Sequence, residues 1–208
     1  GAGTPKAFVD AEGEVAGSLL GVEEMPAALV EMVLDRLGPG QAHTALLEDE
    51  ATFIDLPRSP LWLGHEYPQV NPAPEDVIAT ERSNVLRVVY PLRHLDALTE
   101  GEARRYWLTH HGPIVRRGAP AAGTLCYRQV HRADHPLDAA LREARGTTVE
   151  PYLGTAEAWF DADRAAPTDA ARRANAWFVA DERKFIDFGR STLFLGKEHV
   201  FVDRSGDW

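Results

Sequence analysis

Two adjacent histidines stand near the middle of the chain, in the stretch "EARRYWLTHHGPIVRR" at residues 102–117. An imidazole titrates near neutral pH, so a buried His110 or His111 could act as a general acid or base. Successive helical residues point about 100° apart, so only one of the two can face a given cavity. A core histidine bonded to a backbone carbonyl would leave the same sequence, and both interpretations stay open.

Asp181 is a second candidate for chemistry. It lies between Phe178 and Phe185 on the stripe that a helix over about 169–187 would turn inward. A carboxylate in that place needs a partner, because burying an unpaired charge is costly. It could orient His111 or bind a substrate hydroxyl. It could also be a surface acid at the edge of the stripe, or form an ion pair with an arginine.

Aromatic and basic side chains on neighbouring segments are candidates for a cavity wall. Tyr127 or Tyr90 could donate a hydrogen bond to an oxyanion that develops on a substrate. Tyr106 and Trp107 could instead be core residues, as aromatic side chains at helical spacing usually are. The residues expected to contact a substrate are Tyr90, His94, Tyr106, Trp107, His110, Arg128, His131, Phe178 and Phe185.

The elements that would position these side chains follow the order β-α-β-β-α-β. Strands are predicted at 85–94, 123–133, 151–161 and 191–203, with helices over 99–117 and 169–187. Thr99 and Glu102 have the spacing of a capping box, and Pro113 predicts a kink or a stop. This order predicts the α+β class, as a ferredoxin-like split βαβ unit with both helices on one face of an antiparallel sheet.

The first half of the chain is harder to interpret. A Pro- and Asn-rich segment at 70–84 predicts a boundary between an N-terminal unit, 1–84, and a second domain, 85–208. Residues 1–85 carry 4 basic and 15 acidic side chains, whereas 86–208 carry 18 and 17, which also favours two units. We expect a helix over 26–38 and a strand or hairpin over 41–57. The first unit could be a degenerate ferredoxin-like copy or an unrelated extension.

Composition argues against several classes of protein. A net charge of −10 disfavours nucleic acid, which needs a basic surface. The single Cys126, expected in a core strand, excludes an internal disulfide, and the eight histidines show no metal-ligand spacing on one element. No apolar run is long enough to span a membrane. The opening Gly-Ala-Gly is interpreted as a vector-derived addition rather than a signal peptide, so we expect a cytoplasmic protein.

The stretch "YWLTHHGPIVRR" resembles the Tyr-Trp-x-x-x-His-Gly-Pro-Leu-Val motif of EthD-domain proteins, and "DERKFIDFGRSTLFLGKEHVFVD" resembles the end of that domain. The resemblance covers roughly 85–203 and places the motif histidine at His111, with His110 as an addition and Ile114 in place of leucine. It implies a dimeric α+β barrel. Its open sheet would pair either in a homodimer or, if residues 1–70 form a second sheet, in an intrachain pseudo-dimer.

The resulting functional hypothesis is an enzyme of the lyase or isomerase type that acts without cofactor or metal on a small hydrophobic or aromatic, polyketide-like molecule. His111 would move the proton, assisted by Asp181 and Tyr127, in a dehydration, isomerisation, decarboxylation or cyclisation. Cofactor-free monooxygenation is one alternative. The alternative of another class is a protein that binds small molecules in the same pocket without turnover.

Overall fold

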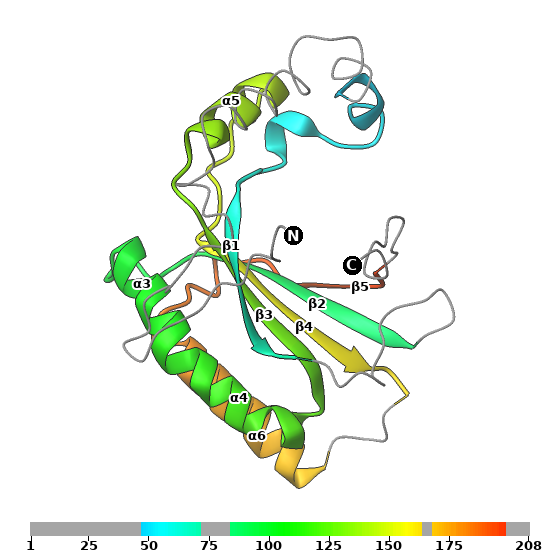
Figure 1. Ribbon diagram of the computed structural model, residues 1–208, viewed down its shortest axis with the longest axis vertical. Coiled ribbons are helices and arrows are strands. Elements are labelled where there is room, and N and C mark those ends of the chain that lie inside the picture. The colour runs from blue at the N-terminus through cyan, green and yellow to red at the C-terminus, as the bar shows by residue number, and fades with distance from the viewer. Residues whose placement is uncertain (1–46, 72–83, 164–167, 199–208) are drawn as a thin grey trace, which may run out of the picture. The chain divides into compact units, whose positions relative to one another are not determined.

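The computed structural model describes residues 47–71, 84–163 and 168–198 (Figure 1). These residues cluster into two compact units. One takes in the described residues up to His65 together with Arg132–Tyr152, and the other those from Glu66 to His131 and from Leu153 onward. The predicted division of the chain between residues 84 and 85 stays a prediction. No helix in the described segments is long and apolar enough to cross a membrane.

An open antiparallel sheet forms the centre of the second unit. Its strands lie in the order β1-β3-β4-β2-β5, and the pairs β2–β4, β3–β4 and β2–β5 are antiparallel. The strands are β1 (Gly64–Val70), β2 (Val85–Leu92), β3 (Thr124–Arg132), β4 (Gly154–Asp161) and β5 (Phe194–Gly196). The α+β class and the antiparallel sheet are confirmed. The sheet has five strands rather than the expected four, because β1 from the first half of the chain adds an edge strand beside β3. The pairing of two sheets into a barrel stays a prediction.

The helix that carries the two histidines has three consecutive parts: α3 (Glu100–Tyr106), a π-helical turn η3 (Trp107–His111) and α4 (Gly112–Ala122). It begins as the sequence predicts, because Thr99 and Glu102 cap each other's backbone N–H groups in a capping box. Pro113 does not stop the helix; it lies in the first turn of α4, directly after the π turn. Gly123, with φ of 75°, ends the helix in the left-handed conformation.

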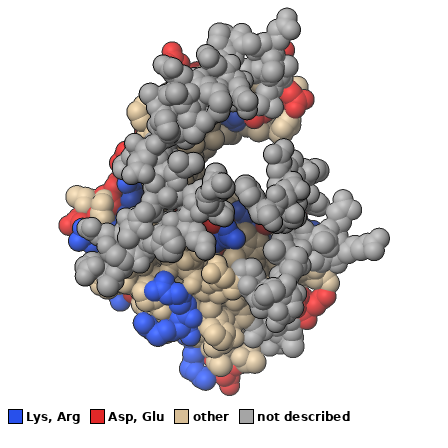
Figure 2. Space-filling view, in the orientation of Figure 1, with Lys and Arg blue, Asp and Glu red and all other residues tan. Residues whose placement is uncertain are grey.

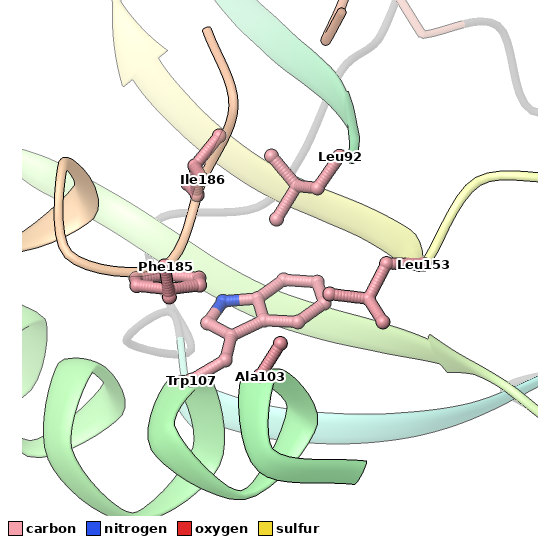
Figure 3. Packing of buried hydrophobic residues seen from close by; sticks show 6 residues of the cluster. All are labelled: Leu92, Ala103, Trp107, Leu153, Phe185 and Ile186. Atoms are coloured by element: carbon pink, nitrogen blue, oxygen red, sulfur yellow. The ribbon is translucent and has the colours of Figure 1, made fainter. Parts of the chain in front are cut away.

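The second helix of this unit, α6 (Asp169–Glu182), packs beside α4 on one face of the sheet (Figure 1). Thr168 begins it by accepting a hydrogen bond from the backbone N–H of Ala171. At the end of the sheet near α3, a buried apolar cluster joins helix, strand and loop (Figure 3). Its members are Leu92, Ala103, Trp107, Leu153, Phe185 and Ile186.

Two sequence expectations were wrong about the other unit. Within the expected strand or hairpin over 41–57, residues 47–50 are helical and Leu56–Arg58 form a 3₁₀ turn, η2. Helix α5 (Pro136–Arg145) was not expected, although Pro136 opens it and Gly146, with φ of 62°, ends it. The helix expected over 26–38, and the part of the last strand beyond residue 198, lie outside the described residues.

Candidate functional site

A pocket of about 280 Å³ lies between the sheet and the helices that cover it. Strands β2, β3 and β4 form its floor, and η3, α4 and α6 form its wall. Apolar side chains dominate its lining, and the polar groups are few. The lining residues are Val88, Tyr90, Leu92, Trp107, His111, Val115, Thr124, Tyr127, Ala156, Ala158, Phe160, Asn175, Phe178, Val179, Glu182, Ile186 and Leu193.

The π turn decides which histidine faces this pocket. His111 is buried, with 3% of its surface exposed, and lines the pocket, whereas His110 lies on the exposed side and stacks on Tyr106. A π turn holds more residues than an α turn, so the inward stripe passes from Trp107 to His111 and then to Val115. The predicted choice of His111 over His110 agrees with this placement. Val115 is the buried residue one turn later, whereas Ile114 is only half-buried.

Gln129 of β3 anchors the π turn from the sheet side. Its side chain is fully buried, and its amide nitrogen donates to the carbonyl oxygen of Trp107 at 3.1 Å. Gly112, the residue after the turn, packs so closely against Gln69 and Gln129 that a β-carbon there would collide with the Gln69 amide. The backbone around His111 is therefore fixed by two glutamines and a glycine.

Asp181 of α6 holds His111 from behind the pocket wall. Its Oδ2 lies 2.9 Å from the Nδ1 atom of His111, and the side chains are 2% and 3% exposed. Its Oδ1 accepts from the Tyr106 hydroxyl at 2.7 Å and from Lys184 Nζ at 2.9 Å. The sequence predicted that a carboxylate on this stripe needs a partner. In the structure, three donors satisfy the Asp181 carboxylate.

This arrangement sets the charge states of the pair. Burial raises the pKa of Asp181, but the hydrogen bonds from Lys184, Tyr106 and His111 outweigh it and bring the pKa below its ordinary value. Burial lowers the pKa of His111, and Asp181 offsets only part of that effect. At neutral pH the pair is therefore a carboxylate and a neutral imidazole. Because the carboxylate accepts the Nδ1 proton, the lone pair is on Nε2, the ring nitrogen on the far side from Asp181.

Tyr127 of β3 brings a hydroxyl group to the floor of the pocket. Its oxygen accepts hydrogen bonds from Trp107 Nε1 at 3.1 Å and from Gln129 Nε2 at 3.4 Å. Both neighbours are donors, so the Tyr127 proton has no acceptor among the described residues. Burial raises the pKa of Tyr127 well above its ordinary value, which keeps it protonated. The hydroxyl can therefore donate to a ligand in the pocket.

Glu182 is a pocket residue that sequence reasoning missed. It follows Asp181 directly, lines the pocket, and its Oε1 lies 3.9 Å from His111 Nε2. Burial, and then the charge of Asp181, raise the pKa of Glu182 to about 7. A helical pattern could have found it, because the α6 residues that line the pocket recur at helical spacing: Asn175, Phe178, Val179 and Glu182.

The other predicted contact residues divide into those near the pocket and those away from it. Tyr90, Trp107 and Phe178 line it, Tyr106 reaches Asp181, and Phe185 packs against the His111 ring with centroids 5.3 Å apart. Six of the nine predicted residues do not line it, Tyr106 and Phe185 among them. Of the other four, His110 is exposed, His131 is buried under Trp107, Arg128 pairs with Glu66, and His94 faces the Leu95 carbonyl.

Metal ligation has no support in the described part of the chain, where no group of three or more His, Cys, Asp or Glu side chains could hold an ion. Cys126 is buried in β3, as expected, and burial raises the pKa of its thiol. The chemistry that the site can perform with its own side chains is proton transfer and hydrogen bonding.

Comparison with known proteins identifies the domain. Residues 95–189 match the family model of the EthD domain, which confirms the resemblance of the histidine motif and of the segment after it. The match includes η3, α4, α6 and the three residues His111, Asp181 and Glu182. None of the curated proteins compared with the chain is significantly similar to it.

Proposed function

From the premise that residues 95–189 are an EthD domain, we propose that the protein is an enzyme that moves a proton on a small apolar carbonyl compound. His111 is the base in this proposal, Asp181 orients and polarises it, and Tyr127 binds the oxygen on which charge develops. The observation that carries the proposal is the buried hydrogen bond of 2.9 Å between His111 and Asp181, at the wall of an apolar pocket.

The substrate class follows from the lining of the pocket. A volume of about 280 Å³ lies at the small end of ligand pockets, so the molecule has about the size of one or two fused rings. Valine, leucine, alanine and phenylalanine side chains on the strands and on α6 favour an aromatic or aliphatic body. The lining has few polar groups: Tyr90, His111, Thr124, Tyr127, Asn175 and Glu182. Of these, His111, Glu182 and Tyr127 favour an oxygen function next to an acidic C–H bond.

The proposed step is the removal of a proton from the carbon next to a carbonyl group. Nε2 of His111 takes the proton, and the C–H electron pair moves to the carbonyl oxygen to form an enolate. The Tyr127 hydroxyl donates to that oxygen, and the dry surroundings strengthen the bond. Asp181 stabilises the imidazolium that forms, because its carboxylate stays ionised. Returning the proton to the same or another atom completes an isomerisation or an exchange.

Exchange of α-protons in D₂O tests this step without knowledge of the natural substrate. β-Tetralone is a suitable probe, because it has two fused rings, one carbonyl group and acidic α-protons. We expect the protein to accelerate the loss of its α-proton signals in ¹H NMR spectra. His111→Ala should lower the catalysed rate by roughly 10²–10⁴, the usual contribution of a positioned base.

His110→Ala is the matched control, since this neighbouring histidine lies outside the pocket. We expect its exchange rate to stay within about threefold of the parent. An equal loss in both variants, or no loss in His111→Ala, would refute His111 as the base. Binding of β-tetralone without any exchange would instead support the alternative of a non-catalytic binding protein.

A further inference from the structure

We propose that Glu182 is a second catalytic residue of this pocket, which gives a proton to a departing hydroxyl group while His111 removes one from the neighbouring carbon. The inference rests on the proposed function, because it uses His111 as the base. It narrows the substrate class to β-hydroxy carbonyl compounds and the reaction to the elimination of water.

The geometry that carries the inference is a pair of consecutive carboxyl groups on opposite sides of one imidazole ring. Asp181 and Glu182 are the last two residues of α6. The first reaches Nδ1 of His111 at 2.9 Å, and the second lies 3.9 Å from Nε2. Only Glu182 is on the pocket side, because it lines the cavity and Asp181 does not.

The surroundings give the two carboxyl groups different tasks. The Asp181 carboxylate accepts from three donors, whereas the Glu182 carboxyl group accepts no hydrogen bond from any described residue. The side chain of Glu182 is only 23% exposed and faces apolar neighbours, so the protonated form is favoured. The groups that face it are His111 from η3, Tyr127 from β3 and Tyr90 from β2, all uncharged at neutral pH, and the charged Asp181 on its own helix. With a pKa of about 7, Glu182 is protonated in about half of the molecules at neutral pH, and in these a neutral base and a neutral acid stand side by side.

The reaction is balanced without any further reactant. Nε2 of His111 takes the proton from the α-carbon, and that C–H electron pair becomes the new carbon–carbon double bond. The bond from the β-carbon to oxygen breaks with its electron pair on oxygen, which receives the Glu182 proton and leaves as water. Tyr127 holds the carbonyl oxygen throughout. The products are an unsaturated carbonyl compound, water, an imidazolium and a carboxylate.

The short separation between the two groups also restores the resting state. After the product leaves, the imidazolium of His111 and the carboxylate of Glu182 are 3.9 Å apart, within reach of direct or water-mediated proton transfer. One proton passes from Nε2 to the carboxylate, and both groups are neutral again. No proton has to be exchanged with bulk solvent between turnovers.

Two probes separate this inference from the proposed function. The aldol adduct of benzaldehyde and acetone loses water to form benzylideneacetone, whose appearance is followed by its ultraviolet absorbance. β-Tetralone needs only a base for exchange. In Glu182→Gln, which keeps the shape of the side chain but not its acidic proton, we expect dehydration to fall by roughly 10²–10⁴, a factor at least tenfold larger than any accompanying fall in exchange.

His111→Ala should lose both reactions, and Asp169→Asn, a charge-removing change at an exposed position of the same helix, should lose neither. If Glu182→Gln dehydrates as fast as the parent, or loses exchange to the same degree as dehydration, the acid role of Glu182 is wrong. If His111→Ala retains both reactions, the proposed function fails and the inference fails with it.

A second measurement tests the acid directly and does not depend on turnover. We expect the ¹³C carboxyl resonance of Glu182, assigned by its absence in Glu182→Gln, to titrate with a pKa of about 7 in the folded protein. A resonance that titrates near the ordinary glutamate value would show a carboxylate at neutral pH. Such a group has no proton to give, so that result would overturn the inference even if neither probe reacted.

Discussion

Asp181→Asn tests whether the Asp181 carboxylate orients the His111 ring, because it removes the charge while the ring stays buried. The amide oxygen of asparagine can still accept from Tyr106 and Lys184. The amide nitrogen, however, would then point its protons at the Nδ1 proton of His111. The imidazole must respond by moving its proton to Nε2, so that Nδ1 becomes the acceptor. This change removes the lone pair that faces the pocket while the ring stays in place.

The magnitude follows from the three hydrogen bonds of the carboxylate. A bond to a charged group contributes about 1 kcal/mol more than a neutral one. The bond from Lys184, whose side chain is 61% exposed, is screened by water and adds little. The part-buried bond from Tyr106 and the buried bond from His111 therefore give a destabilisation of about 2 kcal/mol. Loss of the base should lower the exchange of β-tetralone protons by roughly 10²–10⁴.

Urea denaturation measures the loss of stability, and ¹H NMR in D₂O measures the rate of β-tetralone exchange. Asp169→Asn makes the same chemical change at an exposed position of α6 and should leave both values near those of the parent. A folded Asp181→Asn protein that still exchanges β-tetralone within about threefold of the parent rate would show that the carboxylate does not set the tautomer of His111. The proposed orienting role would then be wrong.

Three further predictions concern the pocket and its frame. The pKa of Glu182 is raised from 4.5 to about 7, so between these pH values the folded protein keeps a proton that the unfolded chain releases. The free energy of unfolding should therefore fall by about 3 kcal/mol as the pH rises from 4.5 to about 7. Urea denaturation of Glu182→Gln should not show this fall. Gly154→Ala should lower the free energy of unfolding by about 1–3 kcal/mol, because its β-carbon would collide with the Val130 carbonyl and press on Trp107. Gly196→Ala, in a strand position with open space, should cost less than about 1 kcal/mol in the same assay. Tyr127→Phe should slow the exchange of β-tetralone by roughly 10²–10³ with little change in affinity, and equal rates would exclude an oxyanion-binding role.

Local signals were sufficient for much of the fold. The capping box at Thr99 marked the start of the helix, and the strand predicted at 123–133 is β3. These patterns depend on neighbours within one element, so a sequence displays them directly. Helix α5 carried similar signals in Pro136 and Gly146, and the prediction overlooked them.

Features that depend on contacts between distant segments could not be predicted from local sequence patterns. The π turn needs Gln129 and Gln69, from two different strands, to pack against Gly112. It decides between His110 and His111, a choice that helical spacing alone left open. Edge strand β1 pairs with a strand that begins more than fifty residues later, which no local pattern indicates.

Glu182 was missed for a physical reason of the same kind. The single inward stripe assumed for the helix over about 169–187 ran through Phe178, Asp181 and Phe185, but α6 ends at Glu182, so Phe185 lies beyond it. The helix instead turns one side to η3, through Asp181, and the neighbouring side to the pocket, through Phe178 and Glu182. A helix that packs against both a helix and a cavity has two adjoining functional faces, and a single stripe through Phe178 and Asp181 left out Glu182.

The central claim is that Asp181 holds His111 as a neutral base with its lone pair on Nε2. The ¹⁵N chemical shifts of the His111 ring, recorded across a pH titration, test it most directly. We predict that Nδ1 is protonated and Nε2 is not at neutral pH, and that the ring titrates below the ordinary histidine value of 6.5 because burial lowers its pKa. A ring that carries its proton on Nε2, or that titrates at or above the ordinary value, would contradict the account.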